Sequence, residues 1–178
     1  EILTTAFNLH ITENPTPIIK EILNDRLREN HRLITNFGAI VQEILNKKAK
    51  IGLAVQIPKL NQSRIDGLVG RLTGEDFEQS KWLLGSPIVN FSQSVVDDMI
   101  RKNAEFHYNS GLKPKVVRKE AGNCCKWCKS LVGTYNYPEV PKDVYRRHQN
   151  CRCTVEYFLK KGVRQDVHTK IIKFDEKL

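Results

Sequence analysis

Soft metal ligands gather in one short stretch of this sequence. They form a CxxC pair and, after nineteen intervening residues, an HxxCxC cluster: Cys125, Cys128, His148, Cys151 and Cys153. Zinc takes four nitrogen or sulfur ligands at tetrahedral corners, and a CxxC turn can place two sulfurs about one ion. The spacing therefore predicts a small zinc-binding knuckle over residues 125–153.

Five candidates compete for the four positions of such a site. The favoured ligands are Cys125, Cys128 and Cys151, with either His148 or Cys153 as the fourth. Cys124 is expected beside the site but outside its ligand shell. All five cysteines lie within 30 residues, and their odd number and close spacing favour a metal in a reducing compartment over disulfides. The alternative interpretation is two unrelated thiol pairs in a small core.

A zinc ion enclosed by four protein ligands has a structural role, because catalytic zinc keeps one position open for water. Other signatures of catalysis are missing from the sequence. The chain has no HExxH helix, no HxE paired with PCxxC, no glycine-rich phosphate loop and no GxSxG elbow. A non-enzymatic role is therefore expected.

The elements that must position these ligands follow from the hydrophobic periodicity. A long first helix is expected to begin at Thr16-Pro17 and to end near Lys48, with Asn30-His31 as a candidate break. Further helices are expected at 62–74, at 75–84 and, after a turn at Ser86-Pro87, at 90–108 with a C-cap at 109–111. Short strands are expected at 115–118, 133–138 and 152–159, and the last would place Cys151 and Cys153 on one face as it begins.

These patterns predict an α+β fold, with a mainly helical N-terminal body and a small C-terminal zinc-stapled β module. The expected regions are a helical region at 1–112, the zinc-binding knuckle at 113–160 and a basic C-terminal tail at 161–178. Hydrophobic residues make up 40% of the chain, and no apolar run approaches the roughly 20 residues that span a bilayer. Because the sequence begins with Glu1 instead of Met, further residues are expected upstream.

The net charge of +9 is confined to the C-terminal third. Residues 1–112 carry 13 basic and 13 acidic side chains, whereas residues 113–178 carry 16 and 7. Such asymmetry indicates an anionic partner, of which nucleic acid is the commonest, although a solvated basic face is the simpler interpretation. The candidate nucleic-acid contacts are Lys126, Lys129, Arg146, Arg147 and Arg152.

Aromatic residues are interspersed with these cations and could stack on bases: Trp127, Tyr135, Tyr137, Tyr145 and Tyr157. They could equally form the small core of a zinc module. The sequence alone leaves both interpretations open.

The motifs together resemble a known family. The segments that carry the resemblance are Val89–Asp98, Gly111–Arg118, Cys124–Cys128, Asp143–His148 and Cys151–Val155, followed by a tail at Gln165–Lys170. They are similar to the C-terminal part of minor capsid proteins of tailed phages and prophages of Gram-positive bacteria, within the broad Mu F-like head-morphogenesis family. The resemblance covers roughly residues 80–170, and its CxxC and HxxCxC motifs are specific.

The resemblance implies a minor head protein present in few copies, which acts with the portal or the major capsid protein in the host cytoplasm and is carried in the virion. It implies metal ligands among the same five residues. The competing hypothesis is a nuclease or toxin-like enzyme, in which His148, Arg146, Arg147 or Glu156 would serve as acid, base or phosphate clamp.

Overall fold

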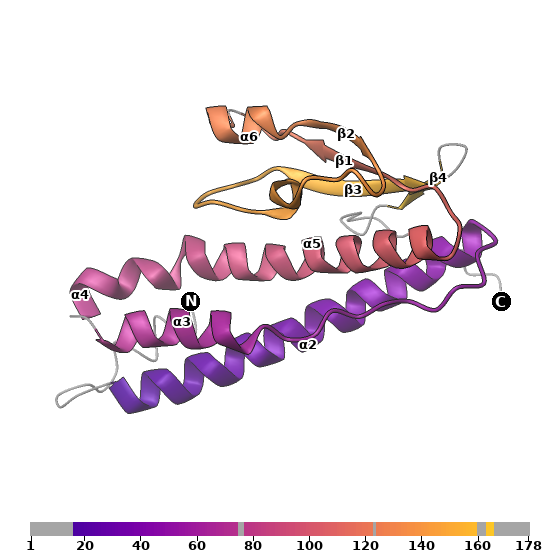
Figure 1. Cartoon of the computed structure of the whole chain (residues 1–178). Coiled ribbons are helices and arrows are strands. Elements are labelled where there is room, and N and C mark those ends of the chain that lie inside the picture. The colour runs from indigo at the N-terminus through magenta and orange to yellow at the C-terminus, as the bar shows by residue number, and fades with distance from the viewer. Residues whose placement is uncertain (1–15, 75–76, 123, 160–162, 166–178) are drawn as a thin grey trace.

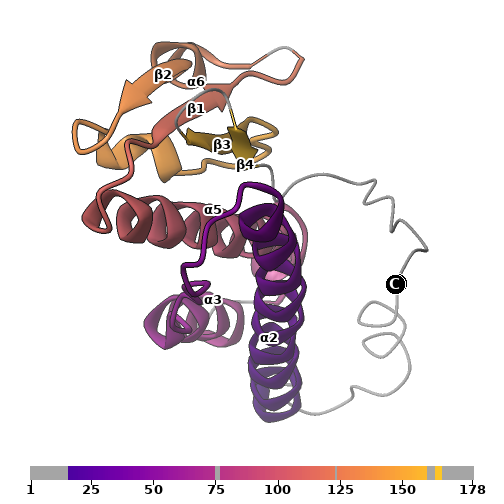
Figure 2. The ribbon, with the colours of Figure 1, turned by 90° about the vertical axis from the view of Figure 1, so that its right-hand side faces the viewer.

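The protein is built in layers around one central helix. The computed structural model describes residues 16–74, 77–122, 124–159 and 163–165. A small sheet covers one side of helix α5, and helices α2 and α3 lie on the other side (Figures 1 and 2). The predicted α+β class is confirmed.

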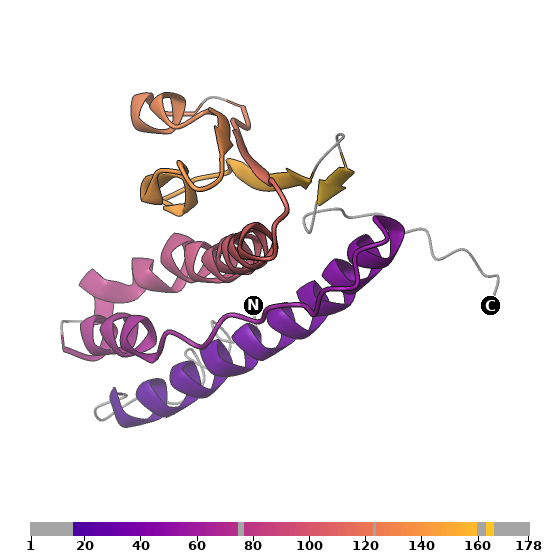
Figure 3. The same cartoon turned by 45° about the vertical axis from the view of Figure 1, so that its right-hand side comes forward.

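The helical body comprises α2 (Thr16–Lys48), α3 (Gln62–Gly74), the single turns α4 (Phe77–Ser80) and η1 (Lys81–Leu84), and α5 (Ser86–Asn109). An extended segment connects α2 to α3 and runs along the body (Figure 3). The amide of Asn103 on α5 holds this segment, because its Oδ1 accepts from the Gln56 N–H at 2.9 Å and its Nδ2 donates to the Gln56 carbonyl at 2.8 Å.

Helix α5 is central because it has apolar residues on two faces. Phe91 and Val95, one helical turn apart, pack into a first core built from α2 and α3. Ile100 and Ala104 pack into a second core with side chains of the sheet. One helix therefore joins the helical body to the C-terminal module.

The sheet is antiparallel, with strand order β2-β1-β3-β4. Its strands are β1 (Lys115–Lys119), β2 (Gly133–Asn136), β3 (Thr154–Leu159) and β4 (Val163–Gln165). Along β1 the period of two buries Val116 and Arg118 while Lys115 and Lys119 are exposed. Val116 enters the second core, and Arg118 lies further along the same face.

Several predicted helix boundaries agree with the structure, and two details were wrong. The C-cap is confirmed: Gly111 has φ +88°, and the N–H of Leu112 donates to the carbonyl of His107 at 3.0 Å. Helix α2 continues through Asn30, whose side chain donates to Ser92 on α5 at 2.5 Å and so makes a tertiary contact. Pro87 lies in the first turn of α5, where its missing N–H costs nothing, instead of in a preceding turn.

The C-terminal module also differs from the prediction. Strand β3 begins at Thr154, so Cys151 and Cys153 precede the strand, and β4 was not predicted. The proposed boundary at 112/113 follows the change from helix to strand, but the second core crosses it, because Val41 and Ile100 pack with residues of the sheet. The predicted 75–84 helix is two short turns over its described part, residues 77–84.

Candidate metal centre

The CxxC pair lies at the start of a single helical turn, α6 (Lys126–Ser130). Cys125 is the N-cap of this turn, and its Sγ accepts a hydrogen bond from the backbone N–H of Cys128 at 3.4 Å. An N-cap side chain that accepts from the N–H three positions later satisfies one of the free N–H groups at the start of a helix. The turn leaves Cys125 exposed and buries Cys128.

The HxxC segment forms a tight turn that is docked on α5. The N–H of Cys151 donates to the carbonyl of His148 at 3.1 Å, and Asn150 has φ +59°, a conformation that asparagine tolerates better than most residues. Asn90 Nδ2 donates to the His148 carbonyl at 2.7 Å, and the Asn150 N–H donates to Ser86 Oγ at 3.0 Å. The first turns of α5 therefore position this half of the site.

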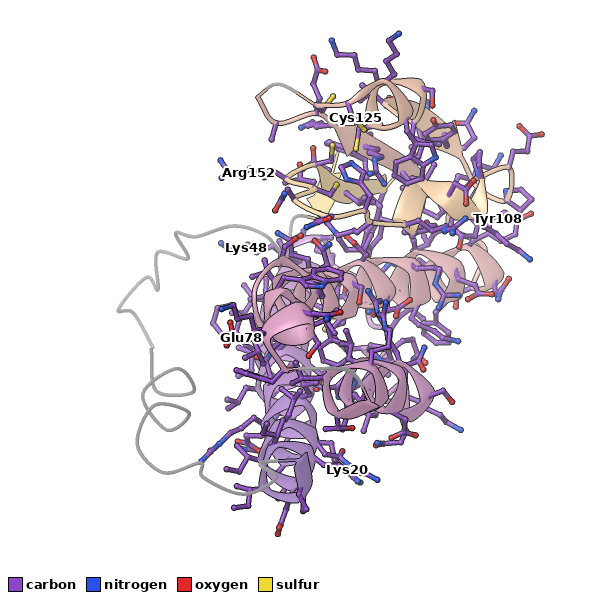
Figure 4. The ribbon with its side chains drawn as sticks, turned by 90° about the vertical axis from the view of Figure 1, so that its left-hand side faces the viewer. Lys20, Lys48, Glu78, Tyr108, Cys125 and Arg152 are labelled. Atoms are coloured by element: carbon purple, nitrogen blue, oxygen red, sulfur yellow. The ribbon has the colours of Figure 1, made fainter. Side chains whose placement is uncertain are left out.

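The fold brings all five predicted ligands together. Their donor atoms form two groups of three that share the Cys128 sulfur, one with Cys125 and His148 and the other with Cys151 and Cys153. Within each group the three atoms lie within 4.8 Å of one another. Figure 4 shows the labelled Cys125 in the sheet layer, at the opposite end of the molecule from Lys20.

Short separations join the CxxC half of the site to the HxxCxC half. His148 Nε2 lies 2.9 Å from the Cys128 sulfur and 3.4 Å from the Cys125 sulfur, and the Cys128 and Cys151 sulfurs are 3.7 Å apart. With metal–sulfur bonds of about 2.3 Å, two sulfurs on a tetrahedral zinc would be roughly 3.8 Å apart. The cluster could therefore hold a metal ion.

The His148 ring is oriented as a ligand would be. Its Nδ1 lies 2.6 Å from the carbonyl oxygen of Gln149, which can only accept a hydrogen bond, so Nδ1 carries the proton. The lone pair is then on Nε2, which faces the sulfurs. Metal-bound histidines are commonly oriented by such a contact at the other ring nitrogen.

The surroundings favour thiolate at two of the cysteines. The backbone N–H of Cys128 lowers the pKa of Cys125 by donating to its sulfur. At Cys151 burial opposes ionisation, but hydrogen bonds and the nearby guanidinium groups of Arg147 and Arg118 outweigh it, so its pKa is lowered as well. Burial raises the pKa of Cys128 to about 12, and a coordinated metal would have to displace that proton.

Cys124 has a different environment from the other four cysteines. Its thiol donates to the Glu120 carboxylate at 3.1 Å, and this hydrogen bond is the main cause that raises its pKa to about 11. It belongs to neither group of three donor atoms. This position agrees with the expectation that Cys124 neighbours the site without being a ligand.

Arg147, a predicted nucleic-acid contact, is buried within the fold. Its side chain is 3% exposed and forms a two-pronged ion pair with Asp97 on α5, at 2.5 and 2.8 Å. It also donates to the carbonyl of Cys153 at 2.6 Å. We therefore remove Arg147 from the side chains that could reach a nucleic acid, because its donors already serve the fold.

The other predicted cations are exposed: Lys126, Lys129, Arg146 and Arg152. Arg146 also pairs with Asp143 at 3.0 Å. The aromatic residues mostly serve as core, because Tyr157 is fully buried and Tyr135, Tyr137 and Tyr145 pack against the second core. Trp127 is the exception, with 37% of its surface exposed.

Sequence reasoning missed the residues that support the site: Ser86, Asn90, Asp97 and Arg118. Each acts through a contact with a segment at least ten positions away, such as the 50 positions that separate Asp97 from Arg147. The one available signal was Arg118, a charged residue at a position of β1 that the strand period assigns to the same face as Val116.

The comparisons with known proteins leave the site to be interpreted from its own chemistry. No protein-family model, no curated protein and no solved structure matches this chain. Among the helices of the described residues, none has both the length and the apolar character needed to cross a membrane.

Proposed function

We propose that the Cys/His cluster binds one structural zinc ion. The observation that carries this proposal is the convergence of a thiol-rich donor set from two distant segments, with His148 already oriented by Gln149. Thiolate and imidazole donors in a compact site suit zinc, whereas hard cations prefer oxygen. The ligands would be Cys125, Cys128, His148 and Cys151, with Cys153 next to Cys128 and Cys151 but outside the shell.

Zinc in such a site would fasten the CxxC segment to the HxxCxC segment. The buried side chains around the cluster are the cysteines themselves, Cys128, Cys151 and Cys153. The metal would thus replace a hydrophobic core at this end of the molecule, as it does in small zinc domains.

We further propose that the chain is a non-enzymatic minor capsid protein of the head-morphogenesis type, acting in assembly with the portal or the major capsid protein. The support is the sequence resemblance over roughly residues 80–170, combined with a helical body that carries a metal-fastened basic module. The exposed Lys126, Lys129 and Arg152 would face DNA or an acidic partner.

The nuclease hypothesis receives less support from the geometry. In the described residues, both His148 ring nitrogens have partners, and Arg147 is buried against Asp97. Glu156 is 2% exposed and pairs with Lys119 on the neighbouring strand. Arg146 lines a hollow with Tyr137 and Tyr145 that does not include His148. General acid–base chemistry needs these groups at one cleft.

The first test is metal content. The reduced protein should contain about one zinc per chain, and Cys128→Ser should remove it. Cys124→Ser is the matched control, because the adjacent thiol bonds to Glu120 and should leave zinc content unchanged. Zinc-free wild-type protein would contradict the metal proposal.

The second test concerns the virion. Particles of the phage that encodes the chain should contain it in few copies by mass spectrometry, and a Cys128→Ser phage should give fewer complete heads. Purified heads that lack the chain, or cleavage of DNA or RNA that is lost in folded, zinc-loaded His148→Ala protein, would overturn this function.

A third test concerns nucleic acid. The chain should bind DNA weakly and with strong salt dependence, because phosphate contacts act by releasing counterions. Replacing Lys126, Lys129 and Arg152 by Gln should reduce the salt slope by about 3. Binding that is insensitive to salt would contradict a phosphate-contacting surface.

A further inference from the structure

Arg118 is a buried cation at the back of the metal centre. It lies on β1 and is 1% exposed. Its Nη1 donates to the carbonyls of Val144 and Arg146, at 2.6 and 2.9 Å, and its guanidinium lies 5.6 Å from the ring centroid of Trp127. Its Nη2 points to two sulfurs of the cluster, Cys128 and Cys151, each at 3.6 Å.

A second buried arginine offers a direct comparison. Arg147 has its charge balanced by the Asp97 carboxylate, which is also buried. In the described part of the chain no carboxylate pairs with Arg118, whose contacts are backbone carbonyls, an aromatic ring and the two sulfurs. A buried charge without a counter-charge is strongly unfavourable, so the sulfurs are the groups that must supply one.

The metal site has the opposite excess. Three thiolates and one neutral imidazole around Zn²⁺ leave a net charge of about −1 in a partly buried site. Hydrogen bonds from N–H groups to metal-bound sulfur spread that charge, and such supporting contacts raise metal affinity. Arg118 is placed to provide both the donor and the balancing charge.

We propose that Arg118 is the positioning residue and counter-charge of the zinc site. Its guanidinium would hold the Cys128 and Cys151 thiolates while anchoring carbonyls of the 3-10 turn η2 (Lys142–Tyr145) and of its C-cap, Arg146. The inference rests on the proposed zinc binding. Zinc binding would then have a second effect. The zinc–thiolate site would balance the charge of a buried arginine on β1, so the packing of β1 would depend on metal occupancy.

The test is the zinc affinity of Arg118→Met, measured by competition with a chelator at fixed pH and salt. Arg118→Met should bind zinc about 10- to 100-fold more weakly than wild type, the usual effect of removing a supporting contact. Leu72→Ala is the control for general destabilisation, because it truncates a side chain that is 2% exposed in the first core, which contains no residue of the metal centre. Its zinc affinity should stay within about threefold of wild type.

Cobalt gives a readout that a merely structural role would not move. In Co²⁺-loaded Arg118→Met the thiolate-to-cobalt charge-transfer band should shift to longer wavelength, because the sulfurs lose their N–H donors. If Arg118→Met does not fold, Arg118→Lys carries the test: its ammonium keeps the charge but cannot bridge carbonyls and sulfurs together, so zinc affinity should fall by about 3- to 10-fold.

The outcomes separate this inference from the zinc proposal itself. Wild-type protein that binds neither zinc nor cobalt would overturn both. Zinc-binding wild-type protein together with unchanged affinity or an unchanged cobalt band in the Arg118 variant would overturn the role of Arg118 alone. An equal loss of affinity in Leu72→Ala would also overturn it, because the effect would then be general destabilisation.

Discussion

Two regions that adjoin helix α5 are held together by different forces. The helical region has a core of aliphatic and aromatic side chains from α2, α3 and α5. In the metal-site region the buried groups include three cysteines and two arginines. Burial of apolar surface can stabilise the helical region alone, whereas the metal-site region needs its thiols and charges to be satisfied. Metal binding should therefore matter mainly in the metal-site region.

The largest expected effect is loss of the metal. Cys151→Ser should release zinc and unfold residues 113–160 first, while the first core of α2 and α3 stays folded. Structural zinc in small domains binds with about 10–16 kcal/mol, which is comparable with the whole stability of a typical domain. Hydrogen exchange followed by mass spectrometry would resolve the two regions. Equal loss of protection throughout the chain would show that the two regions do not differ in their dependence on the metal.

The converse experiment weakens the helical region. Leu72, 2% exposed, lies in the first core, so Leu72→Ala should lower the free energy of unfolding by about 2–5 kcal/mol. Zinc content should stay at that of the wild type, and Ile57→Ala, at a side chain that is 54% exposed, is the control. Urea unfolding and metal analysis measure the two quantities. Zinc loss in Leu72→Ala would mean that the helical region and the metal-site region are coupled more tightly than their contacts indicate.

A finer comparison distinguishes the ligands within the knuckle. His148→Ala should weaken zinc binding and lower the melting temperature together, because His148 Nε2 faces two sulfurs. Cys153→Ala should have the smaller effect if Cys151 completes the shell. Chelator competition on both variants, with Cys124→Ser as the reference, decides the fourth ligand. A silent His148→Ala beside a zinc-free Cys153→Ala would reverse our assignment.

The smallest expected effect is a pH dependence in the second core, which joins helix α5 to the sheet. His107 is fully buried, and burial lowers its pKa below the ordinary value of 6.5. The unfolded chain then binds the proton more readily, so stability is complete above about pH 6.5 and falls as the pH drops toward the folded-state pKa. The slope contributed by this group is at most about 1.4 kcal/mol per pH unit.

His107→Gln isolates this contribution from acid loss of the metal, which affects both proteins. Urea unfolding at pH 7.5 and pH 5.5 should show a smaller drop in the variant than in the wild type. Identical drops would exclude His107 as the cause. The contact that this substitution alters is the one between His107 Nδ1 and the Tyr157 hydroxyl, at 3.3 Å.

The helices and the metal ligands were predictable because both depend on local sequence patterns. The apolar spacing of α3 and the glycine at 111 are local patterns. They led to boundaries near Gln62, Gly74 and Tyr108, which agree with the structure to within one residue. Exceptions occurred where a tertiary contact outweighed a local preference. Asn30 remains helical because it bonds to Ser92, and β4 forms because β3 offers an edge to pair with.

The sequence by itself determined the ligand types and their spacing, because Cys and His side chains at CxxC and HxxCxC intervals carry their chemistry wherever the chain places them. Only the tertiary structure decided what the basic residues do. Arg147 and Arg152 look alike in the sequence, yet one is buried against Asp97 and the other is exposed. Burial depends on partners from distant segments, so the sequence showed a basic region where the structure separates surface cations from the two internal arginines that support the metal centre.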